Sequence, residues 1–407
     1  MDHPATSLGN PRGLDDSQIE VAIVAHGHDR MVATTSIPVT IPKDGPLPKS
    51  MIQDIIGTFL TNEWPNTDPE TLIVTRNTGY ANTNCVVERP PPKNDTHPEP
   101  LKVFLKLHGE LDGEIEVFKH LVPSKHEEAQ LCHDYAQSGL GAKVYGFFQT
   151  EDGTFGRIDE FLNARTLKPA DVEDAHIRAD VAREHAVFHT MSTQREKKPA
   201  QLYYDAVTRE LARYHKMEKL KRLAKEGGVN MYDLVDYDFV SRLRRVTNRL
   251  ESIGGKKGWC IHDVQFMNTM VKNSPKEGEI KIVLIDFEFV FQNYRGFDIG
   301  GHFLQKMFQW FDEENKIATC RPYTEEEKRH FCEEYAKHWD EETGDSDTGK
   351  QVFMESELGF MLAITFEIHN MLCFMDQDDD KDPLNILGLN KLFEEFVNQY
   401  KKLGLGS

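Results

Sequence analysis

Two short apolar runs that each lead into a carboxylate constrain this chain more than any other feature. Residues 259–261 precede Asp263, residues 280–285 precede Asp286, and Asn268 lies between them. A carboxylate at the end of a strand adds nothing to a hydrophobic core, because burying its charge without a partner is costly. Acids and amides in these positions instead suit a site where oxygen ligands and a base converge at one edge of a sheet.

The spacing of these three polar residues predicts a phosphoryl-transfer centre. Asp263 and Asn268 are five residues apart on a loop, and a turn at residues 273–278 leads into the strand that Asp286 ends. A hairpin of this kind brings all three side chains to one end. Mg²⁺ prefers hard oxygen ligands, which Asn268 and Asp286 supply. Asp263 is then free to orient an attacking hydroxyl or accept its proton, as in the protein-kinase template.

The N-terminal half predicts a small β-rich lobe that completes such a centre. Turn-forming residues 77–82 separate two β-prone runs at 71–76 and 84–88, which indicates a hairpin. In the strand at 102–107, apolar residues alternate with others, and the alternation turns Lys106 toward the face where phosphates could lie.

A helix after this strand supplies a partner for Lys106. Ser124 and Glu127 form a capping box, which marks the start of the helix. Glu128 follows and can form an ion pair with Lys106, as the strand lysine and helix glutamate do in protein kinases. Gly79 in the hairpin loop, taken alone, is weak evidence for a phosphate-binding loop. The order of these features, ending in D-x4-N and a strand-end Asp, favours the kinase interpretation over chance.

The remaining segments predict mainly helices. Helical periodicity covers residues 48–64, 176–191, 203–227 and 237–253, and a strand pair is expected at 143–150 and 155–161. His189, within one of these helices, is expected to be a hydrogen-bonded core histidine rather than a ligand.

Composition excludes some partners. Asp and Glu number 67 against 48 Lys and Arg, a net charge of −19, which argues against nucleic acid or an anionic membrane as the main partner. The first 16 residues lack the charged and apolar regions of a secretory signal, and no uninterrupted apolar run approaches ~18 residues, so no membrane span is expected. The six scattered cysteines include no C-x-x-C pair, which favours reduced thiols and a cytoplasmic protein.

Residues 283–303, VLIDFEFVFQNYRGFDIGGHF, resemble the signature of the choline/ethanolamine kinase family. Residues 259–268, WCIHDVQFMN, resemble the catalytic loop of that family, and weaker matches occur at LGAKVYGFF, VFLKLHG and TGYAN. The resemblance covers roughly residues 50–405.

The resemblance implies an α+β, two-lobed protein-kinase-like fold of the choline kinase and aminoglycoside phosphotransferase type. It divides the chain into an N-terminal extension (1–45, partly disordered), a nucleotide-binding N-lobe (46–162) and a catalytic C-lobe (163–407). The implied reaction transfers the γ-phosphate of ATP, with Mg²⁺, to choline or ethanolamine, for phosphatidylcholine or phosphatidylethanolamine synthesis. Family members are often homodimers, so a homodimer is possible.

The resemblance also implies roles for individual residues. It makes Asp263 the catalytic base and puts Gln265 on the loop near the phosphates. Its metal ligands are Asn268 and Asp286, with Glu288 close by. The nucleotide contacts are expected from Gly79, Asn82, Lys106, Glu128 and Glu160, whereas Arg295 and Asp298 are expected to be mainly structural.

The chain departs from the family pattern around the substrate. Gln305 and Lys306 stand where the family has an acid and a tryptophan, and Ile368 and Met371 align with two further tryptophans. The residues before the metal-binding asparagine are Phe266 and Met267 in place of Glu-Gly. The substrate residues expected are Phe289, Gln305 and Trp310, with Phe366 as another aromatic candidate. A kinase of another small amino alcohol, or a weakly active or regulatory protein of the same fold, therefore remains an alternative.

Overall fold

The larger sheet has six strands in the order β1-β5-β6-β4-β3-β2. All neighbours are antiparallel except β1 and β5, which are parallel. The strands are β1 Thr34–Ile37, β2 Ile73–Thr78, β3 Thr83–Glu88, β4 Lys102–Leu107, β5 Val144–Thr150 and β6 Phe155–Glu160. The strand β1 lies within residues 1–45 and adds part of that segment to the edge of the sheet.

The computed structural model describes residues 31–42, 45–78, 82–91, 99–109, 117–227, 234, 236–308 and 321–406. Residues Val32–Ser407 form one compact unit. Gly79 and Trp310 lie outside the described residues. The five described cysteines are free thiols, as expected, and all five are buried.

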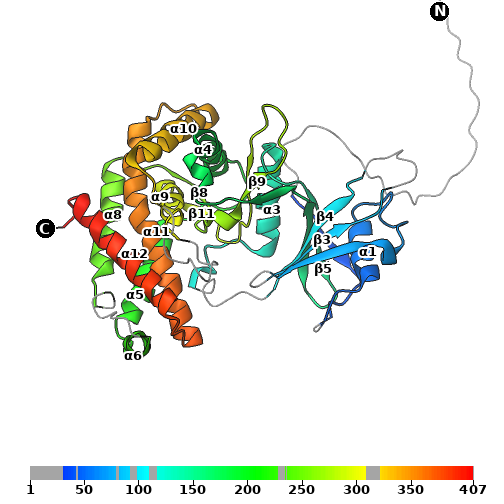
Figure 1. The fold of residues 1–407 in the computed structure, drawn as a ribbon, viewed down its shortest axis with the longest axis horizontal. Helices are drawn as coiled ribbons and strands as arrows, with labels where there is room; N and C mark the ends of the chain where they lie inside the picture. Colours follow the sequence, from blue (N-terminus) through cyan, green and yellow to red (C-terminus); the bar gives the residue numbers. More distant parts are fainter. Residues whose placement is uncertain are drawn as a thin grey trace, which may run out of the picture. The chain divides into compact units, whose positions relative to one another are not determined.

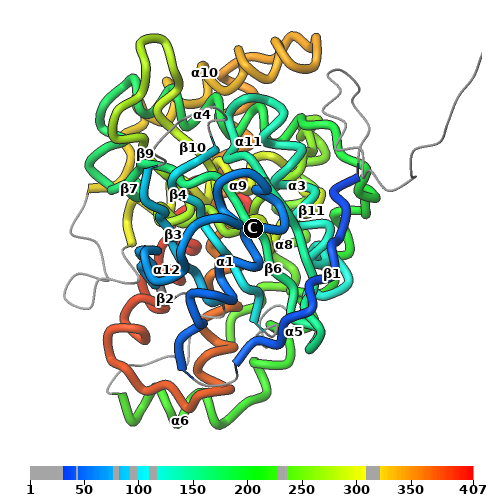
Figure 2. Tube along the Cα trace, turned by 90° about the vertical axis from the view of Figure 1, so that its right-hand side faces the viewer, coloured from blue at the N-terminus to red at the C-terminus, as the bar shows by residue number. Residues whose placement is uncertain are grey.

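Alternation along β4 separates the two faces of the sheet, as the sequence predicted. Val103 and Leu105 are buried against the helix α1 (Lys49–Gly57), which contributes Ile52 and Ile56 to the same core. Figure 1 shows α1 on the side of the sheet away from the C-terminal helices, and Figure 2 shows it in front of the strands. The opposite face, which carries Lys106, is therefore left for the site.

The helix α1 is shorter than the predicted segment 48–64. It ends at Gly57, and the following residues turn so that Trp64 joins the core beneath the sheet. A Cβ on Gly57 would lie 3.3 Å from the Pro65 side chain, so the chain folds back closely at this point.

The helix α3 (Lys125–Gln137) begins at the predicted capping box. The Ser124 side chain accepts from the Glu127 backbone N–H at 3.3 Å, and Glu127 accepts from the Ser124 backbone N–H at 2.8 Å. This cap fixes the first turn and holds Glu128 in the buried position where it meets Lys106.

Helices dominate the chain after the six-stranded sheet. They are α4 Ala175–Thr190, α5 Gln201–Tyr214, α6 Glu218–Glu226, α8 Phe239–Ser252, α9 Gly296–Gln305, α10 Glu325–Thr343, α11 Gly349–Asp378 and α12 Pro383–Lys402, with single 3-10 turns at Asp171–Glu173 and Phe266–Asn268. A further 3-10 turn, Pro69–Thr71, comes earlier, just before β2. The helical run predicted at 203–227 is two helices, because Met217 takes an extended conformation between α5 and α6.

Two small sheets carry the segments that lead into Asp263, Asn268 and Asp286. One has the order β10-β9-β7, and the other pairs β8 with β11. Their strands are β7 Ala164–Thr166, β8 Lys257–Cys260, β9 Thr269–Lys272, β10 Ile282–Leu284 and β11 Phe291–Tyr294. The two acid-bearing strands, β8 and β10, thus belong to different sheets.

The helix α11 runs through the C-terminal helices as a core element. Its backbone approaches α9 so closely that a Cβ on Gly359 would lie 1.7 Å from the carbonyl oxygen of Gly296, which only glycine permits. A window of 18 residues in α11 is long and apolar enough to cross a membrane, although the uninterrupted runs in the sequence did not reveal it. Since 78% of this window is buried inside the protein, a core helix accounts for it.

Candidate active site

The β9–β10 hairpin brings Asn268 and Asp286 to the same end, as predicted. Asn268 directly precedes β9, and its carbonyl accepts from the Ile285 backbone N–H at 3.0 Å, one residue before Asp286. Asp263 arrives from a different sheet, on the loop that follows β8. The Asn268 side chain donates to the Asp263 carboxylate at 2.9 Å, so the three residues form one cluster.

Lys106 connects this cluster to the six-stranded sheet. Its ammonium lies 3.0 Å from the Glu128 carboxylate and 3.1 Å from the Asp286 carboxylate, and its side chain is buried. Burial opposes the charge on Lys106, but Asp286 and Glu128 outweigh that effect and raise its pKa above the ordinary value. The lysine–glutamate pair inferred from the sequence is thus present, and it reaches the strand-end Asp286.

The acids of the cluster crowd one another. Burial and the nearby Asp286 carboxylate raise the pKa of Asp263 to about 6, although hydrogen bonds from Asn268 and Gln265 oppose the change. Burial and Asp286 also raise the pKa of Glu288 to about 7. A divalent cation relieves such crowding, and Asn268, Asp286 and Glu288 offer the hard oxygen atoms that Mg²⁺ prefers. These residues therefore fit a magnesium site.

Asp298 supports residues 261–268, the segment that the sequence predicts to be the catalytic loop. Its carboxylate accepts from the backbone N–H groups of Ile261 at 2.6 Å and His262 at 3.0 Å. His262 has φ +65°, a left-handed conformation that costs a non-glycine residue about 1 to 3 kcal/mol. These two bonds help to stabilise that conformation immediately before Asp263.

His189 supports Asp298 in turn. Its Nε2 lies 3.0 Å from the Asp298 carboxylate, and its Nδ1 lies 2.8 Å from the hydroxyl of Tyr335. All three side chains are buried. His189 is thus a hydrogen-bonded core histidine, as expected, and it forms part of the support for the catalytic loop.

A cavity of about 300 Å³ lies beside Lys106 and Asp286. Asn82 and Glu160 from the predicted nucleotide set also line it, and apolar walls come from Val86, Phe104, Met270, Leu284 and Phe287. Asn82 accepts from the Gly109 backbone N–H at 3.2 Å, which ties the β2–β3 hairpin to the end of β4. A mostly apolar cleft with charge at one end suits a nucleotide.

Of the three predicted substrate residues, Phe289 and Gln305 lie within the described part of the chain. The Gln305 side chain donates to the Glu367 carboxylate at 2.7 Å, and Glu367 comes from the neighbouring helix α11. Lys306 is buried and turns to Glu173 instead, at 2.9 Å. Phe289 is buried, with its ring perpendicular to that of Phe366 at 5.7 Å. The sequence pointed to Gln305 but missed Glu367, because nothing in the sequence pairs the two helices at this register.

Phe266 and Met267, the bulky pair in the catalytic loop, have different surroundings. Phe266 is buried, with its ring 5.0 Å from that of His302, whereas Met267 is 43% exposed. Phe266 thus packs the loop against α9, while Asn268 keeps its hydrogen bond to the Asp263 carboxylate.

Glu184 behind the cavity predicts a pH-dependent stability. It accepts a hydrogen bond from Tyr135, which lines the cavity, and burial raises its pKa well above the ordinary value while Lys272 opposes this. The folded protein therefore binds a proton that the unfolded chain releases, and the free energy of unfolding falls as pH rises through the folded-state pKa. Glu184→Gln and the wild type should have the same free energy of unfolding at pH 5, but at pH 9 the variant should be more stable by about 1 to 3 kcal/mol. Thermal unfolding at pH 5 and at pH 9 measures this. The same difference in stability between variant and wild type at both pH values would contradict it.

Fold and site together define a class, the two-lobed, protein-kinase-like phosphotransferase fold, with a lysine–glutamate pair facing a D-x4-N loop and a strand-end Asp. Within that class, a model of the choline/ethanolamine kinase family matches residues 76–372. The chain therefore belongs to the choline/ethanolamine kinase family.

Individual relatives agree with this assignment. The human choline/ethanolamine kinase is 27% identical over 282 residues, which cover 68% of this chain and 66% of that protein. The crystal structure of choline kinase from Cryptosporidium parvum Iowa II has a TM-score of 0.64 at 15% identity and covers 88% of this chain and 97% of that one. The crystal structure of LicA in complex with AMP has a TM-score of 0.51 at 14% identity and covers 87% of this chain and 100% of that one. The chain spans 52% to 66% of the length of the first curated relatives it matches.

Proposed function

We propose that this protein transfers the γ-phosphate of ATP to the hydroxyl of choline or ethanolamine, with Mg²⁺ as the metal. The observation that carries the proposal is the convergence of Asp263, Asn268 and Asp286 with the Lys106–Glu128 pair at one end of a cleft. Family membership supports the substrate class, and the AMP bound to LicA supports an adenine nucleotide.

The roles of the residues follow from their chemistry. Asp263 accepts the hydroxyl proton as the alcohol oxygen attacks the γ-phosphorus. Lys106 holds phosphate oxygens, and Glu128 fixes its direction from the protein side. Asn268, Asp286 and Glu288 would hold Mg²⁺, which when bound offsets the negative charge on the phosphates. The bond to the β-phosphate oxygen breaks as the new ester forms, so phosphocholine or phosphoethanolamine and ADP leave the site.

The substrate cation needs a negative group near Asp263, and we propose Glu367 for this role. Gly301 on α9 lies against Val264 of the catalytic loop, with a Cβ position only 2.8 Å from the valine side chain. Gln305 follows one helical turn later, about 5 to 6 Å along α9, and holds the Glu367 carboxylate at 2.7 Å. Lys306, bound to Glu173, does not compete for this carboxylate.

Purified protein assayed with ATP and Mg²⁺ against a panel of amino alcohols tests the proposal. Phosphate transfer to choline or ethanolamine is expected, and little to an uncharged alcohol of the same size, because such an alcohol has no ammonium to pair with the Glu367 carboxylate. Transfer to another amino alcohol alone would change the proposed substrate but leave the proposed phosphate transfer in place. Transfer to none would favour a binding or regulatory protein of this fold.

The variant Glu367→Gln sharpens this test. The KM for the amino alcohol should rise at least about tenfold, since a charge-assisted contact contributes about 1.5 to 3 kcal/mol, while the KM for ATP stays unchanged. Asp378→Asn makes the same change of charge at an exposed position near the end of the same helix and serves as the control. Equal effects of the two variants would exclude Glu367 as the substrate's partner.

A further inference from the structure

The cavity beside Lys106 contains a second buried ion pair, between Arg157 and Asp159, and Arg157 also lies 3.5 Å from the Glu128 carboxylate. Arg157 and Asp159 stand on β6, directly opposite Lys106 and Phe104 on β4. Ile158 between them is buried in the core on the α1 side, so the alternation of the strand turns Arg157 and Asp159 to the cleft face. Both line the cavity, together with Cys132 and Tyr135 from α3.

Arg157 fixes the Asp159 carboxylate but leaves it able to accept further hydrogen bonds. The Arg157 Nε lies 2.9 Å and 2.8 Å from the two oxygen atoms of Asp159, and the two residues are only 5% and 8% exposed. A carboxylate has about four acceptor positions on its two oxygens. Because Arg157 offers Asp159 a single donor nitrogen, other acceptor positions of the carboxylate remain and can face the cavity.

The position of the pair indicates which part of a nucleotide it meets. Lys106 and Asp286 mark the phosphate end of the cavity. Asp159 pairs with Phe104, two residues from Lys106 along β4 and thus roughly 6 to 7 Å away, on the side of the cavity that Phe161 and Leu162 also line. A nucleotide with its phosphates at Lys106 therefore places its base beside Asp159.

We propose that Asp159 selects the nucleotide base by accepting a hydrogen bond from the 6-amino group of adenine. The inference rests on the proposed use of a nucleotide by this site and adds the residue that reads its base. A 6-oxo purine presents an acceptor at that position, which faces the fixed carboxylate oxygen without a proton between them. Bases with a 6-oxo group should therefore bind weakly.

Binding of ADP, IDP and GDP in the presence of Mg²⁺, measured by calorimetry on the full chain, tests this. IDP differs from ADP in the 6-amino group, and GDP adds a 2-amino group. Wild type should bind ADP roughly 10- to 100-fold more tightly than IDP or GDP, as expected for a lost charge-assisted hydrogen bond. In Asp159→Asn, Arg157 can hold the amide oxygen and leave the amide nitrogen to donate to a 6-oxo group. The ADP:IDP ratio should then fall at least tenfold.

Glu151→Gln is the control, because it removes one carboxylate charge at an exposed position in the turn between β5 and β6, outside the residues that line the cavity. Its ADP:IDP ratio should equal that of wild type. If Asp159→Asn does not fold, the double variant Arg157→Gln/Asp159→Asn removes both charges and carries the same expectation. An unchanged ratio, or a wild-type preference for GDP, would overturn the inference. Since binding needs no phosphate transfer, a protein that binds ADP selectively but phosphorylates no alcohol would contradict the proposed function alone.

Discussion

Asp263→Asn is expected to lower turnover about 10²- to 10⁴-fold while changing the affinity for ADP less than about threefold. General-base catalysis by a positioned side chain contributes roughly 10² to 10⁴ in rate, and the amide cannot accept the proton. Asn268 can still donate to the amide oxygen at this position, so the loop keeps its geometry. Steady-state kinetics and calorimetric ADP binding measure the two quantities separately.

The pH profile provides the control for this assignment. The base works only as a carboxylate, so kcat/KM of the wild type should rise with pH over an acidic limb. Burial and Asp286 raise the pKa of Asp263 to about 6, and a bound cation would lower it, so the limb lies at or below pH 6. The residual activity of Asp263→Asn should lack this limb. Full activity in the variant would exclude Asp263 as the base.

Local sequence patterns were sufficient to predict the parts of the site that depend on neighbouring residues. The alternation in β4 placed Lys106 on the cleft face, the Ser124–Glu127 box marked the start of α3, and the turn before β10 brought Asp286 back to Asn268. Each of these signals has a period or a fixed spacing of a few residues, so it can be recognised in a single sequence.

The contacts that complete the site have no such signal. Asp298 reaches Ile261 and His262 across more than 35 positions of the chain, and Gln305 reaches Glu367 across 62. Tertiary packing sets these partners, and the same residue types would fit many other pairings. The Arg157–Asp159 pair was legible in principle, since residues two apart share one face of a strand, but only the cavity shows that this face meets a ligand.

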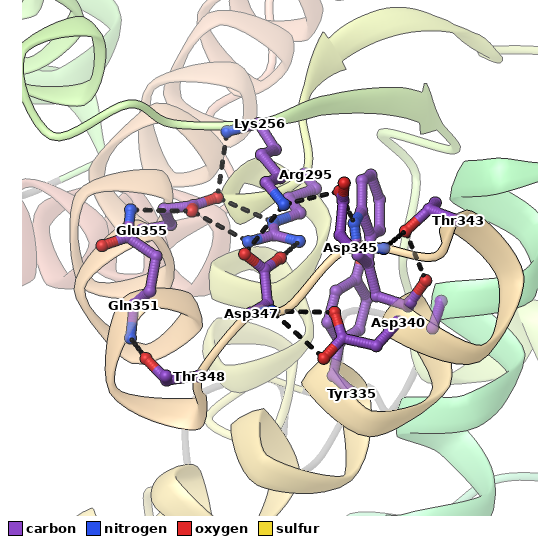
Figure 3. A network of polar contacts seen from close by, with 12 residues as sticks. Lys256, Arg295, Tyr335, Asp340, Thr343, Asp345, Asp347, Thr348, Gln351 and Glu355 are labelled. Atoms are coloured by element: carbon purple, nitrogen blue, oxygen red, sulfur yellow. Dashed lines mark hydrogen bonds and ion pairs between the residues drawn. The ribbon is translucent and has the colours of Figure 1, made fainter.

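Arg295, within the family signature, forms a buried ion network. Its guanidinium bonds both oxygens of Glu355, at 2.8 Å and 2.9 Å, and one oxygen of Asp347 at 2.5 Å (Figure 3). Arg295 and Glu355 are fully buried. The guanidinium also lies 4.4 Å from the ring of Trp339 and 5.6 Å from that of Tyr335, which bonds His189. Through Tyr335, the network is thus connected to His189, which supports the catalytic loop.

Arg295→Met should therefore lower the free energy of unfolding by about 3 to 5 kcal/mol, because it leaves Glu355 and Asp347 as buried charges without their main partner. Thermal and denaturant unfolding measure the loss. Arg165→Met is the matched control. Arg165 makes a similar two-bond pair with Asp171, at 2.6 Å and 2.8 Å, but its side chain is 42% exposed, so the cost should stay below about 1 kcal/mol.

The double variant Arg295→Met/Glu355→Met separates the charge left behind from the packing lost. Two apolar side chains of similar length fill the same space, Glu355 no longer leaves a buried charge, and Asp347 keeps its ion pair with Lys256 at 2.8 Å. Such replacements are often neutral or stabilising. The double variant should therefore recover at least half of the stability lost by Arg295→Met. If it is less stable than the single variant, the network contributes through its own hydrogen bonds. If it regains stability but turnover stays low, Arg295 also acts on the catalytic loop through Tyr335 and His189.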